Sequence, residues 1–130
     1  MAAWPFLLAG VYGVALCLLI SSWHVTPWLM RRFVSDDYAL GSHGQVWADW
    51  HAIGCLFVGI VNLMVYFGDF NAAAATSIAV ASAIIYTIWC LQNLRLVLVR
   101  PALFKTPMWL NVILCGVAAV ASTFAAVNAG

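Results

Sequence analysis

The chain has 130 residues, of which five are Lys or Arg and four are Asp or Glu, so that 7% of the residues carry a formal charge. Hydrophobic residues make up 66% of the chain, and the mean hydropathy is +1.03. Soluble domains carry about 25% charged residues, so this composition excludes a soluble enzyme, and its hydrophobicity excludes a disordered chain. A net charge of +1 without a basic cluster excludes a nucleic-acid-binding protein. We expect an integral membrane protein.

Four apolar stretches are long enough to cross a membrane, which takes about 20 residues of helix. They cover residues 4–23, 45–67, 72–99 and 108–126. Short segments separate them, and the alternating pattern typical of barrel strands is absent. The sequence therefore predicts an all-α integral membrane protein, an antiparallel four-transmembrane-helix bundle with short loops. We expect residues 1–130 to form a single four-span membrane domain.

Residues with known preferences at helix ends mark the predicted boundaries. Pro5 fits the first turn of the first helix, where its missing N–H leaves no hydrogen bond unmade. Thr26-Pro27 predicts the end of that helix or a kink in it. Either Asp69 or Asn71 is expected to cap the third helix, and Thr106-Pro107 predicts the start of the fourth.

All five positively charged residues fall near one side of the predicted bundle. They are Arg31, Arg32, Arg95, Arg100 and Lys105, in or next to the first and third loops. The positive-inside rule makes this side cytoplasmic, matrix or stromal and puts both termini on the opposite side. The first stretch has no preceding Lys or Arg and no small-residue cleavage site after it, so we interpret it as a retained span. A bacterial inner membrane or an organelle membrane is expected.

Each predicted helix carries a stripe of small and polar residues at helical spacing. The stripes are Gly10, Gly13, Cys17, Ser21 and His24; Ala48, His51, Cys55, Gly59 and Asn62; Ala75, Ala79, Ala83, Tyr86, Cys90 and Asn93; and Asn111, Cys115, Ala118, Ser122 and Ala126. Small residues let helices approach closely in lipid, so we expect the four stripes to face one another.

Toward the positively charged side, each stripe carries a polar residue that lies beyond its cysteine. We call these four residues the polar layer; they are His24, His51, Asn93 and Asn111. One hypothesis is a cofactor site, in which the imidazoles bind a haem or a chlorophyll-type tetrapyrrole. The alternative, which we favour, is a hydrogen-bonded network that fixes the register of the helices. We expect no metal at the cysteines, which behave as small hydrophobic residues in such surroundings.

Asp49 and Arg95 lie about one turn inside their helices at the positively charged side, on faces opposite the stripes. The helix dipole favours an acid near the start of a helix and a base near its end. We expect an ion pair between them. The alternative is that Arg95 reaches lipid phosphates while Asp49 faces a partner subunit. Gln92 shares the face of Arg95 and fits either arrangement.

Two functions are compatible with this sequence. It contains no Glu, no arrangement of Ser, His and acid for nucleophilic catalysis and no phosphate-binding loop, so we lean against an enzyme. We expect a non-catalytic accessory or structural subunit of a larger membrane complex, such as a respiratory or photosynthetic assembly. It would contact membrane lipids and other subunits through Asp49, Gln92 and Arg95. The alternative is a small membrane protein that binds, or an enzyme that converts, a lipophilic ligand or a tetrapyrrole at the polar layer.

Overall fold

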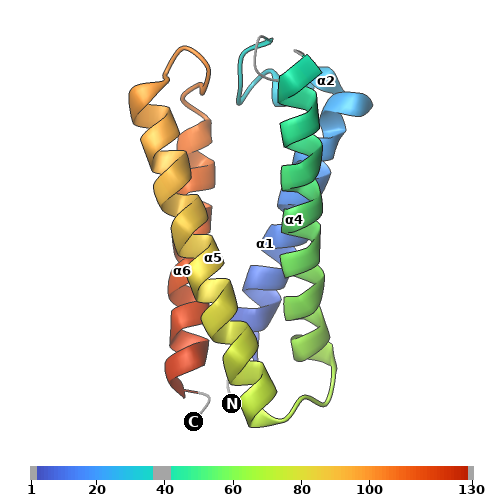
Figure 1. Cartoon of the computed structure of the whole chain (residues 1–130), viewed down its shortest axis with the longest axis vertical. Helices are drawn as coiled ribbons and strands as arrows, with labels where there is room; N and C mark the ends of the chain where they lie inside the picture. Colours follow the sequence, from blue (N-terminus) through green and yellow to red (C-terminus); the bar gives the residue numbers. More distant parts are fainter. Residues whose placement is uncertain (1–2, 37–41, 129–130) are drawn as a thin grey trace.

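The computed structural model describes residues 3–36 and 42–128, and four long helices dominate it (Figure 1). In chain order the helical elements are α1 (Trp4–Ser21), a 3₁₀ turn (Ser22–His24), α2 (Pro27–Met30), α4 (Ser42–Phe67), α5 (Ala72–Val99) and α6 (Met108–Asn128). The helices α1, α4, α5 and α6 are each long and apolar enough to span a membrane. The predicted fold class, an antiparallel bundle of four candidate transmembrane helices, is confirmed.

The helix ends follow the signals in the sequence. Pro5 lies in the first turn of α1. The side-chain oxygen of Asn71 accepts a hydrogen bond from the backbone N–H of Ala74 at 2.8 Å, so Asn71 rather than Asp69 caps α5. The helix α6 begins directly after Thr106-Pro107. One element is additional, because Pro27 starts the short helix α2 in a segment that we expected to be a loop.

The four long helices form two antiparallel pairs. The helix α1 packs along α4, and α5 packs along α6. Contact between the two pairs comes mainly from α1 and α6, whereas α4 and α5 contact each other little. Figure 1 shows that the pairs lie close together at the end that holds both termini and diverge toward the end that holds α2. We call these the closed end and the open end of the bundle.

Glycines allow a close approach between α1 and α4. A Cβ atom on Gly13 would lie 2.8 Å from the backbone oxygen of Cys55, and one on Gly59 would lie 2.7 Å from the backbone nitrogen of Val14. Because these neighbours are backbone atoms, they cannot rotate away from a larger side chain. The stripes of the first two spans therefore face each other, as predicted.

The stripes of α5 and α6 are also largely buried. Their buried members are Ala75, Ala79 and Tyr86 in α5 and Asn111, Cys115, Ala118 and Ser122 in α6. Hydrogen bonds between helices within this core include one from the Asn62 amide to the Ser82 hydroxyl at 2.8 Å and one from the Tyr86 hydroxyl to the backbone oxygen of Ala9 at 2.6 Å. Among the described residues, the Asn62 side-chain oxygen and the Ser122 hydroxyl are buried without a hydrogen-bond partner.

The segments before α4 and before α6 are joined across the open end. Val34 and Phe104 form an isolated antiparallel bridge, in which Ser35 N–H donates to the Leu103 oxygen at 2.9 Å and Lys105 N–H donates to the Phe33 oxygen at 2.8 Å. Met30, Val34 and Phe104 pack together beneath this bridge with residues from α5 and α6. We call residues 30–35 and 103–105 the roof, because they link the two diverging helix pairs.

We predict that Gly13→Ala destabilises the protein by about 1–3 kcal/mol, because the added methyl group forces two backbones apart. The matched control is Gly54→Ala in α4, where an added Cβ meets its nearest atom, in the Trp89 side chain, at 3.9 Å. The control should leave stability unchanged or raise it slightly, since Ala favours helix over Gly. Reversible unfolding in detergent measures both. Equal tolerance of the two substitutions would contradict the close contact between α1 and α4.

Candidate functional site

A cavity of about 370 Å³ lies between the two helix pairs beneath the roof. Its lining residues come from α1, α4, α5, α6 and the roof, and most of them are apolar. Four aromatic side chains contribute to its walls and top: Phe33, Trp47, Trp89 and Phe104. Among the described residues that line it, none is Asp, Glu, Lys or Arg. The cavity is thus an apolar, uncharged space inside the part of the bundle where the helices diverge.

Three members of the polar layer line this cavity, each from a different helix: His51 from α4, Asn93 from α5 and Asn111 from α6. The Asn111 side-chain oxygen accepts a hydrogen bond from the Tyr12 hydroxyl at 2.7 Å, which leaves its NH₂ group to donate elsewhere. The Asn93 NH₂ group donates to the backbone oxygen of Trp89 at 2.7 Å, which leaves its side-chain oxygen to accept.

His51 contributes an imidazole to the same space. Its ring meets the Trp89 ring edge-on, with centroids 5.2 Å apart, and it makes no hydrogen bond within the described part of the chain. Trp89 in turn meets the Tyr86 ring edge-on at 5.6 Å, so packing from the bundle core holds both rings in place. The cavity therefore offers one amide donor, one amide acceptor and one imidazole, which can donate or accept according to its tautomer.

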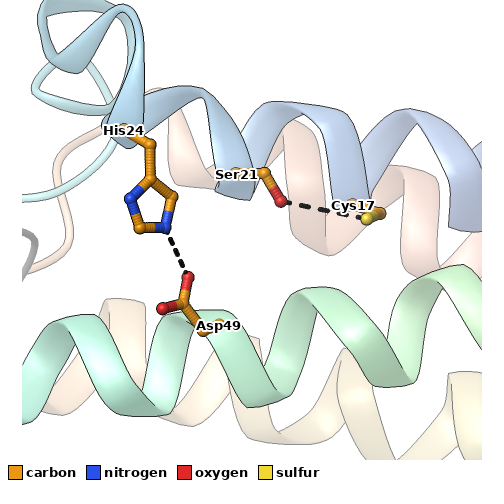
Figure 2. Close-up of polar contacts among 4 residues, drawn as sticks. All are labelled: Cys17, Ser21, His24 and Asp49. Atoms are coloured by element: carbon orange, nitrogen blue, oxygen red, sulfur yellow. Dashed lines mark hydrogen bonds and ion pairs between the residues drawn. The ribbon is translucent and has the colours of Figure 1, made fainter.

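His24, the fourth member of the polar layer, lies on the outer surface and not in the cavity. Its Nε2 atom is 2.8 Å from Oδ1 of Asp49, and the two side chains are 48% and 43% exposed (Figure 2). The physical reason is the 3₁₀ turn that follows Ser21. Each residue of a 3₁₀ turn advances about 120° around the helix axis, compared with about 100° in an α-helix. Over three residues the difference adds up to about 60°, which turns His24 away from the stripe. The two imidazoles that we expected to share a haem thus lie in different surroundings.

The expected ion pair between Asp49 and Arg95 is absent from the described residues, because Asp49 pairs with His24. Asp49 lies on α4 and Arg95 on α5, and these helices belong to different pairs that diverge at the open end. Arg95 is exposed on α5. Gln92 is exposed at the surface and also lines the cavity, so it lies at the boundary between the two.

The cavity opens between α4 and α5. Trp47 on α4 lines it and is 72% exposed, and Gln92 on α5 lines it and is exposed too. We call this opening the mouth. Because α4 and α5 are candidate membrane spans that contact each other little, the mouth faces the region that surrounds the helices and not the roof.

The cysteines do not take part in the cavity lining. Cys55 and Cys115 are buried and Cys17 and Cys90 are half-buried. The Cys115 thiol donates to the backbone oxygen of Tyr86 at 3.2 Å, and the Cys90 thiol donates to that of Val112 at 3.5 Å. Cys17 lies 3.9 Å from the Ser21 hydroxyl within α1 (Figure 2). Over residues 3–36 and 42–128, no group of three or more His, Cys, Asp or Glu side chains is arranged to hold a metal ion.

Tyr12 is the important site residue that sequence reasoning missed. It lies beside the α1 stripe and not on it, yet it fixes the orientation of the Asn111 amide. A signal was available, because a Tyr hydroxyl inside a membrane span needs a hydrogen-bond partner. The aromatic residues of the roof, Phe33 and Phe104, carry no such signal, because they reach the cavity only through pairing of two segments distant in the chain.

Comparison of the chain with protein-family models, with curated proteins and with solved structures gives no match.

We predict that Tyr12→Phe destabilises the protein by about 0.5–1.5 kcal/mol, because Asn111 loses a hydrogen-bond donor. Tyr66→Phe is the control, since the Tyr66 ring packs against Phe67 and its hydroxyl has no hydrogen bond within the described residues. Unfolding in detergent of Tyr12→Phe, Asn111→Leu and the double variant gives the coupling between the two side chains. Strictly additive effects would contradict a direct interaction between them.

Proposed function

We propose that this protein binds a lipophilic small molecule with a polar head in the cavity between its two helix pairs. The observation that carries the proposal is the convergence of His51, Asn93 and Asn111, from three helices, on one apolar cavity of about 370 Å³. Small-molecule sites are typically cavities of about 300–1,000 Å³ with mostly apolar walls and a few polar groups. The cavity matches that description in both size and lining.

The hydrogen bonding of the polar layer favours a ligand over a network that only fixes helix register. Polar groups inside a membrane protein are costly when they are not hydrogen-bonded. A register network would pair these groups with one another across helices. Of the three, only Asn111 has a hydrogen bond to another helix, from Tyr12 at 2.7 Å, and its NH₂ group is left over. Asn93 bonds to the backbone of its own helix, and the His51 ring has no hydrogen bond within the described residues. A bound molecule would supply the missing partners.

The mouth provides a route for such a molecule. A ligand dissolved in the bilayer would pass between Trp47 and Gln92 without crossing water.

We also propose that the open end faces the cytoplasm, matrix or stroma, because Arg31, Arg100 and Lys105 all lie near it. The polar head of the ligand would then lie nearer that side of the membrane.

The proposal predicts that filling the cavity removes the ligand. Leu96→Trp introduces an indole at a lining position, whereas Leu98→Trp introduces the same group at an exposed position two residues further along α5. Native mass spectrometry of protein gently extracted from its membranes should show a small-molecule adduct on the unmodified protein and on Leu98→Trp, but not on Leu96→Trp. An adduct that survives Leu96→Trp, or no adduct on the unmodified protein, would contradict binding in this cavity.

A second candidate function is that of an accessory subunit in a larger membrane complex. The supporting observation is the set of polar side chains on outer helix surfaces, namely the His24–Asp49 pair and Arg95. Polar groups on a lipid-facing surface are costly unless they reach lipid headgroups or a partner protein. A neighbouring subunit on the α4–α5 side of the bundle would provide such contacts.

The second candidate predicts that the extracted protein travels with stoichiometric partners, at a mass far above its own 14.1 kDa. Asp49→Leu and Arg95→Leu should lower the fraction in the complex, because they remove surface groups at the proposed contact. Arg32→Leu is the control, since Arg32 is exposed in the segment after α2 and packs over Trp28. Isolation of the protein as a monomer or small homo-oligomer would contradict the accessory role.

A further inference from the structure

We infer that the cavity selects an uncharged quinone-type head group, a flat ring with carbonyl oxygens on opposite edges, whose apolar chain leaves through the mouth. The inference rests on the proposed binding function and names the chemical class of the ligand. Three features of the cavity lead to it: the absence of charge in its lining, the distribution of its hydrogen-bonding groups, and its aromatic walls.

The lining favours an uncharged head. Among the described residues that line the cavity there is no Asp, Glu, Lys or Arg. Charged side chains at this end of the bundle lie outside the lining: Asp49 pairs with His24 on the outer surface, Arg31 pairs with Asp36 at 2.9 Å, and Arg95 is exposed on α5. A carboxylate, phosphate or ammonium head would therefore be buried without an opposite charge, which is strongly unfavourable in a low-dielectric site.

The hydrogen-bonding groups suit an acceptor at each end of the ligand head. The Asn111 NH₂ group comes from the α5–α6 pair, and the His51 ring comes from the α1–α4 pair, so the two possible donors lie on opposite helix pairs. Two ring carbonyl oxygens on opposite edges can accept one hydrogen bond from each. The Asn93 side-chain oxygen adds an acceptor, which suits a hydroxyl group of the reduced ring.

The Tyr12 hydroxyl makes Asn111 a donor toward the cavity. Because the Tyr12 hydroxyl donates to the Asn111 side-chain oxygen at 2.7 Å, the NH₂ group of Asn111 is the part of the amide that can donate to a ligand. Tyr12 thus acts as a positioning residue for the head group, although it does not line the cavity.

The walls favour a flat ring. Trp47 and Trp89 line the sides and Phe33 and Phe104 belong to the roof, and aromatic faces and edges pack well against a planar ring. The volume of about 370 Å³ is at the lower end of the usual range for ligand sites, so it holds a head group rather than a long chain. The chain would leave between α4 and α5, where it meets the apolar part of the bilayer.

The test compares three probes that share a ten-carbon chain, added to the purified full chain in detergent. Decylubiquinone has an uncharged ring with carbonyl oxygens, decanol is uncharged without a ring, and decanoate carries a negative charge. Dissociation constants come from titrations followed by native mass spectrometry. We expect one decylubiquinone per protein, bound at least tenfold more tightly than decanol, and weaker binding of decanoate than of either.

The variants identify the groups that recognise the ring. His51→Leu and Asn111→Leu should each weaken decylubiquinone binding by about threefold to tenfold, the usual effect of one neutral hydrogen bond, and leave decanol binding unchanged. Tyr12→Phe should have a smaller effect in the same direction. His51→Gln keeps a donor and should restore most of the affinity. Asn128→Leu is the control, because Asn128 lies at the exposed end of α6.

Each other outcome overturns a defined part of the argument. If decanol binds as tightly as decylubiquinone and Leu96→Trp abolishes both, the quinone-type head is wrong while binding in the cavity stands. Tighter binding of decanoate, or no binding of decylubiquinone to a protein that carries its native adduct, would also overturn the uncharged ring. Binding of decylubiquinone that is equally strong in Leu96→Trp and Leu98→Trp would overturn both the ligand class and the cavity as its site.

Discussion

The close contact of Gly13 with Gly59 determines where this bundle has room for anything else. It draws α1 against α4, with backbone atoms under 3 Å from where a Cβ atom would lie, so these two helices behave as one unit. The helices α5 and α6 form the second unit, and α1 and α6 provide most of the contact between the two. The two pairs lie close together at the closed end and diverge toward the other end. The cavity is lined by residues of both pairs and of the roof.

Polar side chains have different surroundings at the two ends of the bundle. In the enclosed core, Tyr86 donates to the Ala9 oxygen and Asn62 donates to Ser82, so these groups link helices. At the open end, His51 and Asn93 face a cavity and make no hydrogen bond to each other. Of the polar-layer residues that line the cavity, Asn111 alone has a hydrogen bond to another helix, from Tyr12.

Local patterns in the sequence were enough to predict most of the fold. The four spans depend on length and apolarity, the cap at Asn71 on a short-range preference, and the buried faces on helical spacing, and all of these act within a few residues. Helical spacing also placed His51, Asn93 and Asn111 on the inner faces of their helices, and all three line the cavity. It placed His24 on an inner face as well, but a 3₁₀ turn of three residues turns that side chain to the outer surface. Asp49 pairs with His24 and not with Arg95 because α4 packs along α1 and not along α5. The spacing of residues within one helix does not specify which helices pack together.

The roof and the mouth lie on different sides of the cavity, and in the proposed function this arrangement would keep a bound head group apart from water. The Val34–Phe104 bridge joins the helix pairs at the end where water would otherwise enter, and its Phe33 and Phe104 side chains line the cavity from above. The mouth lies on the side where α4 and α5 contact each other little. In the proposed function a ligand would exchange with the bilayer through the mouth, between two helices that contact each other little. The glycine contact between α1 and α4 and the Val34–Phe104 bridge lie away from that route, so exchange would not require either of them to break.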